Sequence, residues 1–250
     1  PRPAQRITQA VQLAKARPVA HPAIGRKEFL DEIDGMVFGD DPEQGVRRGR
    51  VFVHPVLGIR FEVPPKFVLF NSARQVVARG PEKSVMVFDM ASDKSARRTR
   101  SLSQYVTDVW APGLSLGRLE KININAMQAV TTSTRINSRG GAKDVRLVAI
   151  RGEDGRIFRL AFITKPSTTS RFATDFQRAT YSFRRISGAE ASAVQPLRIK
   201  VIRVRPGDTP QRLANAFPFE AFRLRWFETL NGLKHGQGVR PGGRVKVVAE

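Results

Sequence analysis

The residues that most often carry catalysis are scarce in this sequence. Its three histidines are His21 and His54, each followed by a proline, and His235, which stands in a glycine-rich stretch. None belongs to an HExxH pattern, which would place two imidazoles one helical turn apart on zinc with a glutamate beside them. The GxSxG elbow, the Walker loop and the Rossmann fingerprint are also missing. The sequence therefore favours a chain that is not an enzyme. A site that folding assembles from His54 and carboxylates is the alternative.

Metal binding is not indicated either. The sequence has no cysteine, which excludes disulfides and thiolate zinc sites but leaves the compartment open. A group of carboxylates lies between positions 31 and 43, but calcium loops need a regular alternation of oxygen ligands with a closing glutamate, and this spacing does not supply it. We expect no cofactor in this segment. The carboxylates in question are Asp31, Glu32, Asp34, Asp40, Asp41 and Glu43.

The chain is strongly basic. Its 43 lysines and arginines against 22 acidic residues give a formal net charge of +21. The excess is spread through the sequence and is not gathered in a tail, so it would attract any polyanion. No zinc-finger, RNP or recognition-helix pattern accompanies it, which makes nucleic acid an unlikely partner. No apolar run approaches the length of a membrane-spanning helix.

The last fifth of the chain, residues 199–250, has a clear order of elements. Alternating apolar residues predict a strand from Ile199 to Arg205 and another near the end of the chain. Two stretches with apolar residues at helical spacing lie between them, the second running from Phe222 to Leu230. Asp208 or Thr209 is a natural N-cap for the first helix. The predicted order is strand, helix, helix, strand.

This stretch resembles the LysM module, a small βααβ unit that binds cell-wall glycans. The matching residues are Val204-x-Pro206-Gly207-Asp208-Thr209, Leu213-Ala214, Leu230-Asn231-Gly232-Leu233 and Arg240-Pro241-Gly242-x-Arg244-Val245. The resemblance implies a glycan-binding groove between two loops. Turn formation and helix capping explain the same residues without a ligand. The candidate glycan-binding residues are Gly207, Asp208, Thr209, Pro210, Asn231, Gly232, Leu233 and Lys234.

Residues 46–187 predict an α+β domain. Alternating stretches indicate an antiparallel sheet of six or seven strands, with two long helices, one of them capped by Ser101. The strongest local signal is a hairpin around the turn Gly152–Gly155. The order of elements resembles the PsbP-like fold. The carrying residues are the HP-x-x-G-x-x-F-x-x-P motif from His54 to Pro64 and the helix that ends in Tyr181-Ser182-Phe183-Arg184-Arg185.

The remaining segments connect these domains. Residues 1–45 predict a helical N-terminal extension, with a first helix stopped by Pro18 and Pro22 and packed on a neighbour. A second short helix ends at Gly35. Residues 188–198 predict a linker that contains a short helix.

Nearly the whole chain resembles the non-catalytic C-terminal region of HtpX/BepA-like bacterial zinc metalloproteases. The carrying residues are Arg6-Ile7, Ile33-Asp34-Gly35-Met36-Val37-Phe38-Gly39-Asp40-Asp41-Pro42, Gly49-Arg50-x-Phe52-x-His54-Pro55-x-Leu57-Gly58, Phe67-x-Leu69-x-Asn71 and Pro196-Leu197-Arg198-Ile199.

This resemblance implies a zinc-binding HExxH peptidase domain upstream of Pro1 and a location in the periplasm or cell envelope. The implied partners are that peptidase domain and either peptidoglycan or protein substrates. A stand-alone basic protein that binds polyanions or nucleic acid is the alternative.

Overall fold

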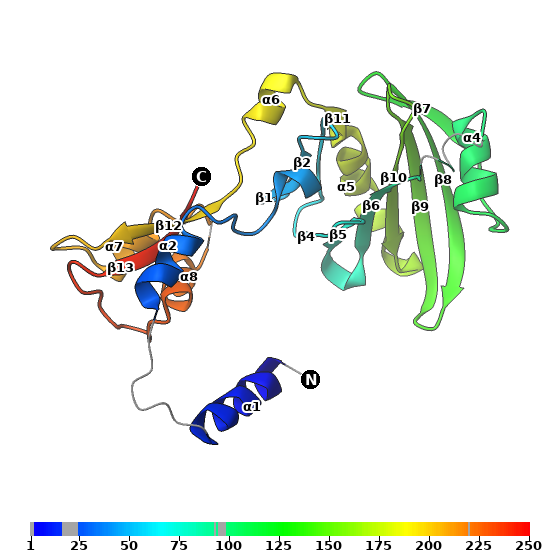
Figure 1. Cartoon of the computed structure of the whole chain (residues 1–250). Coiled ribbons are helices and arrows are strands. Elements are labelled where there is room, and N and C mark those ends of the chain that lie inside the picture. Colours follow the sequence, from blue (N-terminus) through cyan, green and yellow to red (C-terminus); the bar gives the residue numbers. More distant parts are fainter. Residues whose placement is uncertain (1–2, 17–24, 93, 95–98, 220) are drawn as a thin grey trace. The chain divides into compact units, whose positions relative to one another are not determined.

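The computed structural model describes residues 3–16, 25–92, 94, 99–219 and 221–250 (Figure 1). The chain forms two compact units. One comprises residues 1–36 and 198–249, and is called here the C-terminal unit. The other comprises residues 37–197 together with residue 250, and is called the α+β unit.

The α+β unit is built on a seven-stranded antiparallel sheet with the order β4-β5-β6-β10-β9-β8-β7. All neighbours but β6 and β10 are consecutive along the chain. The predicted α+β class with an antiparallel sheet is therefore confirmed. The strands are β4 (Val68–Asn71), β5 (Val76–Arg79), β6 (Val85–Met90), β7 (Glu120–Ile124), β8 (Met127–Ser138), β9 (Gly141–Arg151) and β10 (Ile157–Thr164).

The predicted central hairpin is formed by β9 and β10. Arg151 pairs with Ile157, and the turn between them is closed by a hydrogen bond of 2.9 Å from the Gly152 amide to the Arg156 carbonyl. Gly155 adopts a φ of +81°, a conformation that glycine reaches without a steric penalty.

One face of this sheet is covered by α5 (Thr169–Ser182), which follows the short turn η4 (Pro166–Thr168). Phe172, Phe176 and Ala179 lie at helical spacing and are buried against the sheet. The rings of Phe162 and Phe176 have centroids 4.6 Å apart. Burial of each such aromatic side chain contributes about 2–3 kcal/mol.

A second, four-stranded sheet with the order β1-β2-β3-β11 packs on the same core. The Phe61 ring contacts Phe52 at 5.2 Å and Phe88 at 4.9 Å between centroids. The sequence predicted one sheet, whereas the strands form two; β3 ends just before Pro64, which has no amide to continue a ladder. The strands are β1 (Val46–Arg48), β2 (Val51–His54), β3 (Ile59–Glu62) and β11 (Arg184–Arg185).

The aromatic packing requires glycine at one position. Gly45 follows the turn η1 (Pro42–Gln44) with a φ of +86°. A Cβ atom added there would lie 2.3 Å from the Cζ atom of Phe52. The position therefore needs glycine both for its backbone conformation and for the space that Phe52 occupies.

The opposite face of the seven-stranded sheet carries α4 (Leu102–Tyr105), which continues as the π-helical segment η3 (Val106–Trp110) (Figure 1). Ser101 caps it as predicted, its hydroxyl accepting a hydrogen bond of 3.1 Å from the Gln104 amide. The Arg159 guanidinium donates to both carboxylate oxygens of Asp89, at 2.6 and 2.5 Å, and to the Tyr105 hydroxyl at 3.3 Å. Together these contacts hold α4 to the sheet.

The C-terminal unit has its four main elements in the predicted order. They are β12 (Arg198–Arg203), α7 (Pro210–Ala214), α8 (Arg223–Asn231) and β13 (Arg244–Ala249). The two strands pair antiparallel, with Ile199 opposite Val248. Phe217 and Phe227 are fully buried between the helices and the strands.

The N-terminal boundary differs from the prediction. The helix α2 (Arg26–Ile33) and the residues after it up to Met36 belong to the C-terminal unit, and residues 37–45 belong to the α+β unit, whereas the sequence placed all of them in an extension spanning residues 1–45. The Gly35 amide donates to the Ile199 carbonyl at 2.8 Å, and the Asp34 carboxylate accepts from the Val201 amide at 2.8 Å. Because β13 pairs with only one edge of β12, the other edge is open to this segment.

Three further elements complete the described structure. The helix α1 (Pro3–Ala16) keeps its apolar residues Ile7, Val11 and Leu13 exposed, so they do not form the packed face that we expected. The turn η2 (Pro81–Lys83) precedes β6, and α6 (Gly188–Ser192) lies in the predicted linker. Pro18, His21 and Pro22 lie outside the described residues. None of the described helices is long and apolar enough to span a membrane.

We predict that Asp89→Asn lowers the free energy of unfolding by about 2–4 kcal/mol, because it leaves the half-buried Arg159 guanidinium without its anion. Urea unfolding followed by circular dichroism measures this loss. The matched control is Glu62→Gln, which removes the partner of Arg50 in a more exposed ion pair and should change stability by less than about 1 kcal/mol. Equal effects of the two variants would contradict the assigned role of Asp89.

The second prediction concerns Glu190 in α6. Hydrogen bonds from Arg184 are the largest cause that lowers the pKa of this carboxyl, and the Ser187 amide of the capping box adds to it; together they bring the pKa from 4.5 to about 2. A lowered folded-state pKa means that the stabilisation is complete above the unfolded pKa and is lost as the pH falls from about 4.5 to about 2. Carboxyl-detected NMR titration should give a midpoint near 2. A midpoint near 4.5 would show that the contacts of Glu190 with Arg184 and with the Ser187 amide are not formed.

Candidate functional site

The first loop of predicted glycan-binding residues is a tightly bonded turn. Gly207 has a φ of +83°, and the Asp208 carboxylate accepts a hydrogen bond of 2.8 Å from the Arg205 amide. The Thr209 hydroxyl caps α7 by accepting from the Arg212 amide at 3.2 Å, and Pro210 occupies the first helical position. The side chains of this loop therefore hold the turn itself.

The second loop is bonded to β13. The Asn231 amide group donates to the Lys246 carbonyl at 2.8 Å and accepts from the Lys246 amide at 2.7 Å. Gly232 ends α8 in the left-handed conformation, with a φ of +65°. The Leu233 amide donates to the Glu228 carbonyl at 2.8 Å, and the Lys234 amide donates to the Gln237 side chain at 2.9 Å. The Asn231 side chain thus makes the two hydrogen bonds to the Lys246 backbone that a neighbouring strand would make.

A cavity of about 770 Å³ lies beside the first loop. Of the eight predicted residues, only Asp208 lines it; Asn231 to Lys234 do not. Arginines form much of its polar border, and the remainder is largely apolar. The alternation of β12 and the spacing of α7 could have identified these residues in the sequence. The lining residues are Ile202, Arg203, Val204, Arg205, Pro206, Asp208, Arg212, Leu213, Ala216 and Gly242.

Aromatic residues are exposed on the same unit. The sequence placed Phe222 and Trp226 in the apolar stripe of the second helix, but their side chains are 71% and 46% exposed. Phe222 precedes α8 with a φ of +59°, which turns the chain and takes its ring away from the core. The Trp226 ring contacts that of Phe219 in a tilted arrangement, with 5.2 Å between centroids, and Phe227 is the aromatic residue of this helix that fills the core.

The histidines occupy two different environments. His235 contacts the buried Glu228 carboxylate, with 3.3 Å between His235 Nδ1 and Glu228 Oε1. The same carboxylate accepts a hydrogen bond from the Gly236 amide, so it closes the loop after α8. His54 borders a hollow of about 320 Å³, and burial lowers its pKa, with Arg156 adding to the effect.

The hollow beside His54 does not assemble a catalytic pair from the described side chains. His54 Nδ1 accepts a hydrogen bond of 3.3 Å from the Leu57 amide. Asp89 and Glu43 also line the hollow, but the Asp89 carboxylate is bonded to Arg159. A general base needs a partner that orients it, and none of the ion pairs among the described residues includes His54. The described residues also contain no cluster of three or more potential metal ligands.

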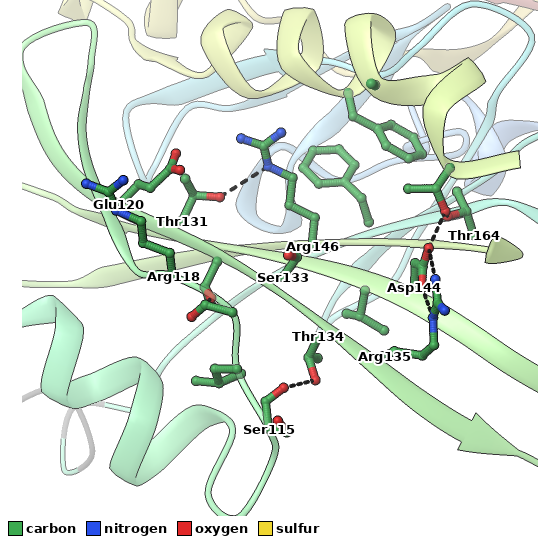
Figure 2. Close-up of a pocket in the computed structure, with 18 residues that line it drawn as sticks. Ser115, Arg118, Glu120, Thr131, Ser133, Thr134, Arg135, Asp144, Arg146 and Thr164 are labelled. Carbon is green, nitrogen blue, oxygen red and sulfur yellow. Dashed lines mark hydrogen bonds and ion pairs between the residues drawn. The ribbon is translucent and has the colours of Figure 1, made fainter.

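The α+β unit also has a cleft of about 700 Å³, larger than the hollow beside His54, at the polar end of the seven-stranded sheet (Figure 2). Sequence reasoning missed it, because its residues come from four strands, the segment before β7 and α5. The lining residues are Ser115, Leu116, Gly117, Arg118, Glu120, Thr131, Thr132, Ser133, Thr134, Arg135, Asp144, Val145, Arg146, Phe162, Thr164, Thr169, Ala173 and Phe176.

The two ends of this cleft differ in charge pairing. At one end Asp144 accepts hydrogen bonds from Arg135 at 2.6 and 3.2 Å and from the Thr169 hydroxyl at 2.7 Å. The bonds from Arg135 are the largest cause that holds the pKa of Asp144 below its usual value. At the other end Arg146 Nε donates to the Thr131 hydroxyl at 3.1 Å.

Comparison with known proteins yields no family model and no curated protein that matches the chain. Several solved structures align with it. LpqN of Mycobacterium tuberculosis, described as involved in cell envelope biogenesis, is 11% identical over 67% of this chain and 100% of that chain, with a TM-score of 0.40. The Ran-binding protein Mog1p of Saccharomyces cerevisiae is 11% identical over 53% of this chain and 92% of that chain, with a TM-score of 0.36.

One of the solved structures that align with the chain is a PsbP protein, the fold that the sequence resembles. The PsbP protein CyanoP of Synechocystis sp. PCC 6803 is 13% identical over 56% of this chain and 98% of that chain, with a TM-score of 0.39. TM-scores below 0.5 carry no argument about kinship or function. The α+β architecture is shown by the structure itself, and the LysM and metalloprotease resemblances stay predictions.

We predict that Asn231→Ala destabilises the C-terminal unit by about 2–3 kcal/mol, because the Lys246 amide and carbonyl lose their partner. Amide hydrogen exchange at Lys246 should accelerate accordingly. Lys234→Ala is the control from the same loop and should leave the exchange rate almost unchanged. Unchanged protection in Asn231→Ala would contradict a structural role for this residue.

Proposed function

We propose that this chain is a non-catalytic binding region of a bacterial envelope zinc metalloprotease, and that its C-terminal unit contacts peptidoglycan. The single observation that carries the proposal is the cavity of about 770 Å³ beside the turn Pro206–Asp208, within a unit whose elements follow the order of a LysM module. The metalloprotease parentage and the periplasmic location rest on the sequence resemblance.

The cavity has the two kinds of surface that a glycan needs. Sugar rings present an apolar face and a border of hydroxyl and acetamido groups. Val204, Pro206 and Leu213 supply an apolar surface, while Arg205 and Arg212 supply charged donors at its border. Asp208 fixes the turn, and we infer that it positions the loop backbone for hydrogen bonds to the sugar.

The α+β unit has a different place in this proposal. We propose that it is PsbP-like, which accords with its antiparallel sheet and with the helix α5 that ends in the predicted Tyr181–Arg185 motif. It would support the upstream peptidase domain, where the catalytic zinc is expected, or contact protein substrates. The described residues take no part in bond cleavage in this proposal.

The second candidate function is general polyanion binding, which the net charge of +21 favours. In that case affinity would follow the number of positive charges and would fall steeply with salt, whichever arginines are present. A glycan site requires particular residues instead. Paired variants that remove equal charge from different places therefore separate the two functions.

We predict that the double variant Arg205→Gln/Arg212→Gln reduces retention of the full chain on purified peptidoglycan on the order of tenfold at about 0.3 M salt, because charge-assisted hydrogen bonds at the cavity are lost. The fraction bound in a sedimentation assay measures this. The control is Lys200→Gln/Arg240→Gln, which removes the same charge from residues of the unit that do not line the cavity.

The sedimentation assay distinguishes a glycan site from general polyanion binding. Retention of the control variant at the wild-type level supports a glycan site at the cavity. An equal loss in both variants would favour polyanion binding. No retention of the wild-type chain at about 0.3 M salt would remove the peptidoglycan proposal altogether.

A further inference from the structure

We propose that the cleft at the polar end of the seven-stranded sheet binds the carboxyl terminus of a peptide that ends in an apolar residue. The proposal concerns the α+β unit and is independent of glycan binding by the C-terminal unit. It rests on four features of the cleft: a guanidinium with unused donors, a neutralised opposite end, a carboxylate near the guanidinium, and an apolar wall (Figure 2).

Arg146 supplies the anion-binding group. Its side chain is half-buried, and Nε is fixed by the hydrogen bond of 3.1 Å to the Thr131 hydroxyl. No ion pair in the described part of the chain includes Arg146 or the nearby Arg118. The terminal nitrogens of a guanidinium match the two oxygens of a carboxylate. The fixed side chain is therefore preorganised for a ligand carboxylate.

Arg135 shows the contrast within the same cleft. Its guanidinium is held by the two oxygens of Asp144, which also accepts from the Thr169 hydroxyl. The charges at that end of the cleft therefore neutralise each other, and the bond from Thr169 to Asp144 links the β8–β9 hairpin to the start of α5. A ligand anion gains most at the Arg146 end, where positive charge has no protein partner among the described residues.

Glu120 makes the site selective for a peptide rather than for any anion. It pairs with Thr131 across β7 and β8, so its side chain leaves the sheet on the same face as Thr131. Figure 2 shows its carboxylate on the side of the cleft where Thr131 and Arg146 lie. A simple anion would be repelled by Glu120. A peptide terminus offers both a carboxylate for Arg146 and a backbone amide that can donate to Glu120.

The wall of the cleft fits an apolar terminal side chain. Phe162 from β10 and Phe176 from α5 line it with their rings in contact, and Ala173 lies one turn before Phe176. Cavities of roughly 300–1,000 Å³ are typical of sites for small ligands, and the cleft lies in this range. The space is enough for the last two or three residues of a peptide.

Isothermal titration of the full chain with the peptide N-acetyl-Ala-Ala-Leu tests the proposal. We expect saturable binding of the free acid and at least roughly tenfold weaker binding of the C-terminal amide, since the amide cannot accept both guanidinium donors. Arg146→Gln should lose at least roughly tenfold in affinity, and Glu120→Gln should lose several-fold for the peptide. Lys143→Gln, which removes a positive charge of the same strand, β9, from outside the cleft lining, should bind within about twofold of wild type.

Three results would overturn the proposal: no saturable binding of the acid, equal binding of acid and amide, or full affinity in Arg146→Gln. Octanoate serves as a second probe, because it carries the carboxylate and an apolar chain without an amide. If octanoate bound more tightly than the peptide, the ligand would be an apolar carboxylate and not a peptide terminus. If Arg146→Gln lowers the melting temperature of the protein, the variant Arg146→Lys replaces it. Lysine keeps the positive charge but lacks the paired donors of a guanidinium. Wild-type affinity of Arg146→Lys would equally refute the role of Arg146.

Discussion

The α+β unit depends on a mismatch of length between its sheet and the helix that covers it. The strand β8 has 12 residues, or about 40 Å at 3.3–3.4 Å per residue. The helix α5 has 14 residues, which span about 21 Å at 1.5 Å per residue. The helix can cover only part of this face. The covered part is lined with Phe88, Leu160 and Phe162, and the remainder has to be polar.

This mismatch explains why a cleft forms where it does. Beyond the apolar core the same strands present threonine, serine, arginine and aspartate on the face that α5 leaves open. Asp144 and Arg135 satisfy each other there, as polar groups near a core must. Arg146, at the other end of the cleft, has only its Nε hydrogen-bonded to a described side chain. Core packing and a binding surface therefore share one side of the sheet.

The C-terminal unit is small, and different contacts stabilise it. Two strands and two short helices bury few large side chains, chiefly Phe217 and Phe227. Polar side chains complete the backbone pairing: Asn231 bonds to Lys246, and Asp34 bonds to the free edge of β12. With these groups committed to structure, the arginines at the cavity and the exposed Trp226 are among the groups of this unit that face outward. The high charge is thus partly structural and partly available for a ligand.

The sequence by itself determined the features that short-range physics controls. Alternation of apolar residues and the Gly152–Gly155 turn predicted the hairpin of β9 and β10, and the sequence also predicted a helix ending in Tyr181-Ser182-Phe183-Arg184-Arg185, where α5 lies. Side-chain capping at Ser101, and at Asp208 or Thr209, was also predicted, because the acceptor and the amide lie three residues apart; the second cap is Thr209.

Only the tertiary structure decided the rest, because the contacts join distant parts of the chain. Asp34 and Val201 are 167 positions apart, so the place of α2 could not be read from local pattern. The same holds for Phe222 and Trp226, whose helical spacing fits a buried face although they are exposed. Arg135 and Arg146 are both basic residues in strands. Strand register gives Arg135 the carboxylate of Asp144 and leaves the Nη groups of Arg146 facing the cleft, and register is set by the packing of the whole sheet.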